Sequence, residues 1–209
     1  MNTDATVFVV DDDQAMRTSL QWLIESTGLT VQTYESADVF LARYTPGRPG
    51  CLLLDVRMPG MSGLELQAHL ARAGYRLPVI LITGHGDVAM AVKAMKAGAV
   101  DFIEKPFHDE DLLRSIARAL DDDKQKRAKH AMRAEIAARL AELTPREHEV
   151  MAMVTDGRSN KDIAAALGVS AKTVEAHRAR VMEKMRAESL AELVRMALAV
   201  ASEDHPAGR

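Results

Sequence analysis

The sequence predicts an α/β domain with a doubly wound, five-stranded parallel sheet of the flavodoxin-like type, followed by an all-α domain of four helices that contains a helix-turn-helix. Three observations support this division. Strand and helix patterns alternate through about the first 120 residues, and only helical patterns follow. The charge also changes sign, since residues 1–123 hold 11 Lys/Arg against 18 Asp/Glu, a net charge of −7, whereas residues 124–209 hold 16 against 12, a net charge of +4.

Length and composition exclude several classes of protein. A chain of 209 residues has room for one or two domains, and its 47% hydrophobic and 27% charged residues exclude a disordered chain, a collagen-like fibre and a membrane channel. We find no apolar run of the ~18 residues that a membrane span needs, and no basic start typical of a signal peptide, so we expect a cytoplasmic protein without a membrane partner. The single cysteine, Cys51, excludes a disulfide framework and a cysteine-built zinc site.

In the first half, short β-branched or apolar runs predict buried parallel strands, and apolar residues at helical spacing predict the helices between them. The predicted strands are 7–10, 29–34, 51–54, 79–82 and 100–103. The predicted helices are 15–26, 37–44, 63–73, 87–97 and 109–120. This alternation is typical of a parallel sheet covered by helices on both faces.

Four helices are predicted in the second half, at 145–156, 160–167, 171–186 and 189–200. Thr144, Pro145 and Glu147 form a typical helix start, with an N-cap, a proline at the first helical position and a capping-box acid. The connector before them contains neither Pro nor Gly and is rich in Ala, so we expect it to be helical. We therefore predict a first domain at 1–121, a helical linker at 122–143, a helix-turn-helix domain at 144–201 and a disordered tail at 202–209.

Polar residues follow four of the predicted strands, directly or after one residue. Asp11, Asp12 and Asp13 follow the first strand, and Asp55 follows the third. Thr83 follows the fourth strand, and Lys105 comes soon after the fifth. Because the carboxyl ends of parallel strands meet at one edge of an open sheet, we expect these residues to form one pocket.

Such a set of residues suits a divalent cation and phosphoryl transfer. Carboxylates at close range repel one another by ~4 kcal/mol per pair near 4 Å, and hard oxygen ligands without His or Cys favour Mg2+. One carboxylate can then act as a nucleophile toward a phosphoryl group, with Lys105 as a second fixed charge and Thr83 as a hydrogen-bond donor. Taken alone, Asp13 is expected only to cap the following helix.

These motifs resemble the receiver domain of two-component response regulators over residues 5–121. They are VVDDD at 9–13, LDVRMPGMSG at 54–63, TGHG at 83–86 and KPF at 105–107. The resemblance implies that a sensor histidine kinase phosphorylates Asp55. It implies that Asp12, Asp55 and the backbone carbonyl of Arg57 hold Mg2+, with Asp11 acting through water. It also implies that Thr83 and Phe102 rearrange together as a switch.

In the second half, two predicted helices joined by the turn at 168–170 form a helix-turn-helix. Helical phase places Val174, His177, Val181 and Met185 on the core face of the second of these helices. We expect His177 to be hydrogen-bonded there. The residues expected to contact DNA, through bases or phosphates, are Lys161, Lys172, Thr173, Glu175, Ala176, Ala179, Arg180 and Lys184.

The second half resembles the LuxR-type DNA-binding domain through the segments LTPRE at 143–147, NKDIA at 160–164 and SAKTVEAH at 170–177. The whole chain thus resembles response regulators of the FixJ/NarL class, and the segments at 83–88 and 102–107 favour the FixJ branch. The resemblance implies a phosphorylation-switched regulator of transcription, which we expect to be an activator. The implied partners are a sensor histidine kinase, double-stranded promoter DNA, RNA polymerase and, after phosphorylation, a second copy of the chain.

Two alternatives remain at this point. A phosphatase or phosphotransferase with an aspartate nucleophile usually carries a second acid two residues later, where this chain has Arg57, so we expect no enzyme. In the other alternative, the helical half is a bundle that binds a protein partner, and a gel-shift with genomic fragments would distinguish it from a DNA-binding domain.

Overall fold

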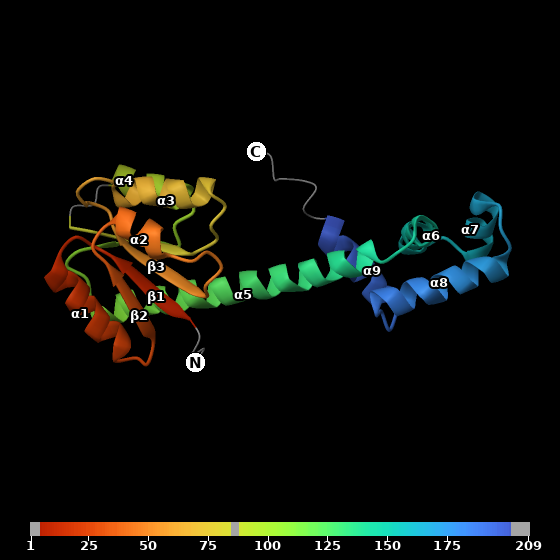
Figure 1. Ribbon diagram of the computed structural model, residues 1–209, viewed down its shortest axis with the longest axis horizontal. Helices are drawn as coiled ribbons and strands as arrows, with labels where there is room; N and C mark the ends of the chain where they lie inside the picture. Colours follow the sequence, from red (N-terminus) through yellow and green to blue (C-terminus); the bar gives the residue numbers. More distant parts are fainter. Residues whose placement is uncertain (1–4, 85–87, 202–209) are drawn as a thin grey trace. The chain divides into compact units, whose positions relative to one another are not determined.

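The computed structural model describes residues 5–84 and 88–201, which fall into two compact units divided between Arg127 and Ala128 (Figure 1). The tail predicted at 202–209 lies outside the described residues, as do His85, Gly86 and the predicted helix start at Asp87.

The first unit contains a five-stranded sheet in the order β2-β1-β3-β4-β5, with all neighbouring strands parallel. Figure 1 labels β1, β2 and β3 of this sheet. This arrangement confirms the predicted doubly wound α/β fold. The strands are β1 (Thr6–Val10), β2 (Thr30–Tyr34), β3 (Gly50–Asp55), β4 (Val79–Thr83) and β5 (Asp101–Glu104).

Helices cover both faces of this sheet, as the continuous apolar strands require. One face packs against α1 (Gln14–Glu25) and the start of α5 (Asp109–Ala141), through residues such as Ile24 and Ile116. The other face packs against α2 (Ala37–Arg43), α3 (Gly63–Arg72) and α4 (Val88–Lys96), through residues such as Phe40 and Leu66. Every residue of β1, β3 and β4 is buried, so the sheet forms a rigid base for whatever follows the strand ends.

α5 is a single helix that covers both the predicted helix at 109–120 and most of the predicted linker at 122–143. The division between the units at 127/128 lies inside the predicted linker 122–143. Acids placed four residues before bases favour the helical state there. Asp122 lies 2.6 Å from the Lys126 ammonium, and Asp123 lies 2.6 Å from Arg127 Nε.

The carboxylate of Asp123 ties α5 to the start of β3. It is buried and accepts hydrogen bonds from the Gly50 backbone N–H at 3.0 Å and from Arg127 Nε. The guanidinium of Arg127 also donates to the carbonyls of Gly47 and Arg48. A side chain at position 50 would collide with the Thr6 carbonyl at 2.0 Å, so the close approach of β3 to β1 requires glycine here.

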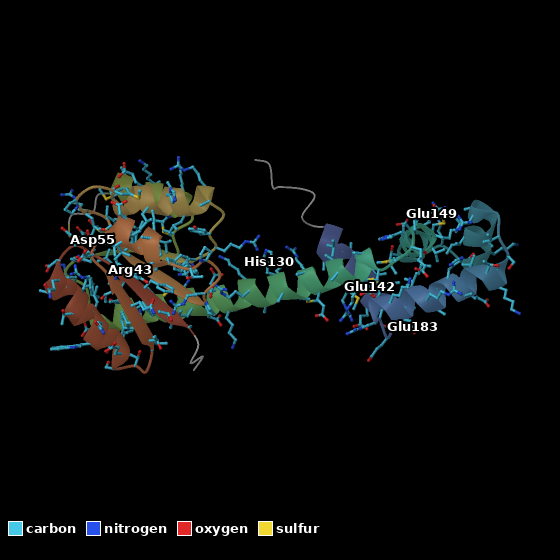
Figure 2. All side chains as sticks on the ribbon, in the orientation of Figure 1. Arg43, Asp55, His130, Glu142, Glu149 and Glu183 are labelled. Atoms are coloured by element: carbon cyan, nitrogen blue, oxygen red, sulfur yellow. The ribbon has the colours of Figure 1, made fainter. Side chains whose placement is uncertain are left out.

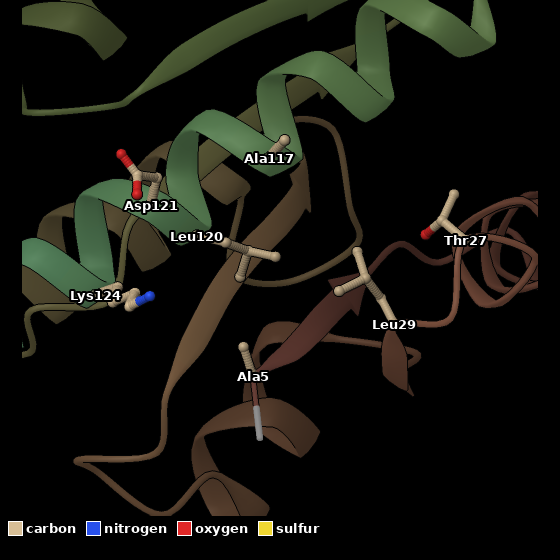
Figure 3. Close-up of a pocket in the computed structure, with 7 residues that line it drawn as sticks. All are labelled: Ala5, Thr27, Leu29, Ala117, Leu120, Asp121 and Lys124. Carbon is tan, nitrogen blue, oxygen red and sulfur yellow. The ribbon is translucent and has the colours of Figure 1, made fainter. Parts of the chain in front are cut away.

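A pocket of about 310 Å³ lies nearby, at the amino ends of β1 and β2 (Figure 3). Ala5, Leu29 and Leu120 give it apolar walls, and Asp121 and Lys124 stand at its side. It lies at the edge of the sheet opposite to the polar residues that follow the strands. It is therefore separate from the polar residues at the carboxyl edge of the sheet.

The second unit is all-helical, as predicted. Its helices are α6 (Pro145–Thr155), α7 (Asn160–Leu167), α8 (Ala171–Met185) and α9 (Leu190–Ala201). Its core also takes in Ile136 and Leu143, from the end of α5 and the segment that follows it. Over the residues that the structure describes, no helix has the length and apolarity needed to cross a membrane.

The Asp123 contact gives a testable prediction. Asp123→Ala leaves the Gly50 N–H and the Nε of Arg127 without their side-chain acceptor, and should lower the free energy of unfolding of the first unit by ~1–3 kcal/mol. Asp122→Ala is the matched control, because it removes only an exposed pair and should change stability by less than ~0.5 kcal/mol. Urea unfolding followed by the fluorescence of Trp22, the single tryptophan, measures both values. Equal losses in the two variants would contradict the proposed contact.

Candidate functional site

Three charged side chains that are distant in sequence meet at the carboxyl edge of the sheet. The Lys105 ammonium lies 3.0 Å from Asp11 Oδ2 and 2.8 Å from Asp55 Oδ1, and so bridges the two carboxylates. Both acids are almost fully buried, with 3% and 7% of their surface exposed. Figure 2 labels Asp55 on the ribbon of the first unit. The sequence prediction that these residues share one pocket is consistent with this geometry.

Strand pairing places these residues next to one another. Asp11 follows β1 directly, Asp55 is the last residue of β3, and Lys105 follows β5 directly. β1 pairs with β3, and the Lys105 backbone N–H donates to the Thr83 carbonyl at 2.7 Å, which fixes the end of β5 against β4. The other oxygen of Asp55, Oδ2, accepts a hydrogen bond from the Arg57 backbone N–H at 2.7 Å. The Asp55 side chain is therefore held through both of its oxygens.

Burial dominates the electrostatics of the site. It raises the pKa of Asp55 above its ordinary value, and the negative charge of Asp11 acts in the same direction, although the hydrogen bond from Lys105 opposes both. Burial alone would lower the pKa of Lys105, but the hydrogen bonds and charges of Asp55 and Asp11 outweigh it and raise that pKa. The lysine thus stays cationic beside a carboxylate that is poorly solvated, a combination that suits a nucleophile.

The other residues named from the sequence lie at the start of α1, at the end of β4 and in β5. Asp13 is the N-cap of α1 and accepts from the backbone N–H groups of Ala15 and Met16, which confirms its predicted role. Thr83 is fully buried at the end of β4. Phe102 is half-buried in β5, paired with Leu81 of β4.

Asp12 differs from its two neighbours. Its side chain is exposed, and its carboxylate has no hydrogen-bond or ion-pair partner within the described parts of the chain. Residues 5–84 and 88–201 contain no group of three or more His, Cys, Asp or Glu side chains arranged to hold a metal ion. The nearby donors are nevertheless all oxygens, and Mg2+ commonly takes only one or two carboxylates and keeps several waters. The donor chemistry of Asp11, Asp12 and Asp55 therefore fits Mg2+.

Sequence reasoning missed one residue beside this site, Arg17. Its guanidinium Nη1 donates to the Asp11 carbonyl at 2.7 Å, from one turn into α1. Its position four residues after the Asp13 cap places it over the first turn of that helix. The four-residue spacing from Asp13 could have indicated that Arg17 lies near this helix start, but it does not show which acceptor the Arg17 side chain binds.

In the second unit, α7, the turn and α8 form the predicted helix-turn-helix. Gly168 ends α7 in the left-handed conformation (φ 66°), and the Ser170 side chain caps α8. Buried residues on α8 are Val174, Val181 and Met185, as its helical phase predicts. Most of the predicted DNA-contacting residues are exposed, namely Lys161, Lys172, Thr173, Glu175, Ala176, Ala179 and Arg180.

Two side chains of α8 lie differently from expectation. Lys184 is half-buried and pairs with the buried carboxylate of Glu147 at 2.6 Å, and it also donates to the Glu142 carbonyl at 3.0 Å. These contacts engage the ammonium inside its own unit, so its contact with DNA stays a prediction. His177 is half-buried, but its Nδ1 has no hydrogen-bond partner among the described residues, so the expected hydrogen bond of that nitrogen is absent.

Comparison with known families gives two matches that together span most of the chain. Residues 7–117 match the response regulator receiver domain. Residues 141–197 match the luxR family of bacterial regulatory proteins. Both resemblances inferred from the motifs are thereby confirmed.

Individual relatives match both units. Transcriptional regulatory protein FixJ of Rhizobium meliloti is 49% identical over 197 residues, which cover 94% of this chain and 97% of that protein. Nodulation protein W of Bradyrhizobium diazoefficiens is 48% identical, over 93% of this chain and 86% of that protein. Among solved structures, response regulator StyR is 41% identical with a TM-score of 0.85, over 94% of this chain and 99% of that one. Full-length FixJ from B. japonicum is 43% identical with a TM-score of 0.58, and the match covers 96% of this chain and 99% of that one.

The Glu147–Lys184 pair predicts a pH dependence of stability. The hydrogen bond from Lys184 and that from the Thr144 backbone N–H lower the pKa of Glu147 to about 2. A carboxyl whose pKa is lowered by folding stabilises the protein above its unfolded pKa, and this contribution is lost as the pH falls through the folded pKa.

Calorimetric unfolding of the wild type and of Glu147→Gln tests this effect. The contributions of the other titrating groups cancel when the free energy of unfolding of the variant is subtracted from that of the wild type. The stability difference should be constant above about pH 4.5 and should shrink as the pH falls toward 2. A difference that does not change with pH would show that the pair does not lower this pKa.

Proposed function

The chain belongs to the two-component response regulators of the FixJ/NarL class, and we propose that Asp55 is the residue whose phosphorylation switches it. Members of this family are regulators of transcription with a receiver domain and a LuxR-type DNA-binding domain, and phosphorylation by a kinase is typical of them. The observation that carries the assignment to Asp55 is the ion pair of its buried carboxylate with Lys105.

The proposed reaction transfers a phosphoryl group from a histidine of the sensor kinase to Asp55. A carboxylate oxygen of Asp55 attacks phosphorus, the bond from phosphorus to the histidine nitrogen breaks, and that nitrogen keeps the electron pair. Lys105 offers a fixed positive charge to the transferred group, and the Thr83 hydroxyl is the proposed hydrogen-bond donor to it. The chain accepts the group and acts as a regulator, so we propose no further enzymatic activity.

Receiver domains bind Mg2+ at the phosphorylation site. In this chain, Asp12, Asp55 and the backbone carbonyl of Arg57 would hold the ion, with Asp11 acting through water. When bound, Mg2+ neutralises charge on the phosphoryl oxygens. The exposed Asp12 carboxylate and the Asp11–Asp55 pair supply the hard oxygen donors that this ion prefers.

The phosphorylated chain is proposed to dimerise through α4. In the proposed switch, Thr83 and Phe102 change arrangement together, and Phe102 lies in β5, which α4 contacts. Val88, Val92 and Met95 leave an apolar stripe of α4 exposed, with 81%, 47% and 46% of their surfaces accessible. Such a stripe is suited to a self-complementary contact about a two-fold axis.

The dimer is proposed to bind promoter DNA through the exposed face of α8 and to activate transcription by RNA polymerase. Ala176 and Ala179 allow a close approach to base edges, and Lys161, Lys172, Thr173 and Arg180 suit phosphate contacts. Because promoter DNA and the polymerase are found there, the cytoplasm is the proposed location.

Phosphorylation of Asp55 can be tested directly. Asp55→Asn should abolish the acid-labile phosphoryl mass that a small phosphodonor adds to the wild type in the presence of Mg2+, because the nucleophilic oxygen is lost. Asp13→Asn is the matched control, since asparagine still caps α1 and the acceptor is untouched. Intact-mass spectrometry measures both proteins, and full labelling of Asp55→Asn would show that another residue is the acceptor.

Dimerisation should depend on the α4 stripe. With the phosphoryl mimic beryllofluoride, the wild type should dimerise, whereas Val92→Glu should stay monomeric because it places a charge in the apolar contact. Trp22→Gln is the control, because Trp22 on α1 is a large apolar side chain that is even more exposed (72%) than Val92 (47%). Sedimentation velocity distinguishes the species, and a dimer of Val92→Glu would place the interface elsewhere.

Two kinds of DNA contact should separate in a mutant series. Lys161→Ala and Arg180→Ala should each weaken binding to all sequences and flatten the plot of log affinity against log salt by ~0.9. Glu175→Ala should leave that slope unchanged and remove ~1–3 kcal/mol of discrimination at one base position. Binding to a set of base-substituted operators at several salt concentrations measures both effects. If Glu175→Ala lowers affinity equally for every operator, Glu175 does not read a base.

A further inference from the structure

The peptide bond that precedes Asp12 is fixed by Arg17. The Arg17 guanidinium Nη1 donates to the Asp11 carbonyl at 2.7 Å, in a partly buried position. That carbonyl belongs to the peptide unit that joins Asp11 to Asp12, and this unit is planar. The hydrogen bond to its oxygen therefore restrains the orientation of the peptide plane on the N-terminal side of Asp12.

The peptide bond that follows Asp12 is fixed as well. The Asp13 backbone N–H belongs to that unit and donates to Asp11 Oδ1 at 2.8 Å. Asp11 is itself immobilised, since its Oδ2 accepts from Lys105 and its backbone N–H donates to the Tyr34 carbonyl at 3.2 Å. Asp12 thus lies between two restrained peptide planes, while its own carboxylate is exposed and has no partner among the described residues.

We propose that Arg17 is a positioning residue for the divalent cation, which acts by presenting the Asp12 carboxylate in a fixed direction. This inference rests on the proposed function, because it assumes that Asp12 holds Mg2+. A ligand whose backbone is already ordered loses less entropy on binding, and partners that orient a metal ligand commonly change metal affinity by about tenfold or more when they are removed.

The positioning role and a purely electrostatic role predict opposite changes in Mg2+ affinity when Arg17 is replaced. The guanidinium is a permanent cation close to the acidic residues, and it repels Mg2+. If charge were its only effect, Arg17→Met would tighten Mg2+ binding. If Arg17 positions Asp12, the same substitution weakens binding despite the removal of a repulsive charge.

Isothermal titration calorimetry of Mg2+ into the full chain measures the Kd for Mg2+ and so shows which way it changes. Arg17→Met should raise the Kd for Mg2+ by about tenfold, and Arg17→Lys, which keeps a cationic donor, should restore part of the loss. Arg72→Met is the matched control, because Arg72 Nε makes the same kind of bond to a carbonyl, that of Ala68, on an exposed face of α3. It should leave the Kd unchanged.

A double substitution separates positioning from a general loss of structure. If Arg17 acts through Asp12, adding Arg17→Met to Asp12→Ala should not lower the residual Mg2+ affinity any further. A further tenfold loss in that background, or an Arg17→Met protein that binds Mg2+ as tightly as the wild type or more tightly, would overturn the inference. Failure of the proposed metal site looks different, because Asp12→Ala would then bind Mg2+ as the wild type does.

Discussion

The bridge from the Lys105 ammonium to Asp11 and Asp55 is the contact on which the site depends. Two nearly buried carboxylates repel each other, and the fold tolerates them only because a cation lies 3.0 Å and 2.8 Å from their oxygens. Lys105 can reach both because β1, β3 and β5 end at the same edge of one parallel sheet. The sheet therefore does more than support the site, since it holds together charges that would otherwise separate.

One of these strands, β3, connects this edge to α5. β3 ends at Asp55 and begins at Gly50, whose N–H donates to Asp123 of α5. In the second unit, Ile136 of α5 is buried in the core and the Arg139 guanidinium donates to the Met185 carbonyl at the end of α8. β3, which ends at the proposed acceptor Asp55, and α5, which contacts the end of α8 through Arg139, are thus each held by specific contacts.

Sequence patterns predicted what is local, or periodic, in this chain. The strand runs, the cap at Asp13 and the buried face of α8 depend on near neighbours and on the helical or strand repeat, so all three agree with the structure. Contacts between distant elements were not predictable in this way. The Lys184–Glu147 pair spans 37 residues and the Asp123–Gly50 contact spans 73, and the partner of each depends on how helices pack. The bond from Arg17 to Asp11 is closer in sequence, but a carbonyl acceptor leaves no signal in the residue pattern.

Lys105, in this view, stabilises Asp11 and Asp55 as one coupled group. The most direct test is a double-mutant cycle on the free energy of unfolding, with Lys105→Met, Asp55→Asn and the double variant. Lys105→Met should be far more damaging when Asp55 is charged than when it is asparagine, which corresponds to a coupling energy of ~1–3 kcal/mol. Additivity of the two single substitutions within ~0.5 kcal/mol would show that the bridge does not hold the site together.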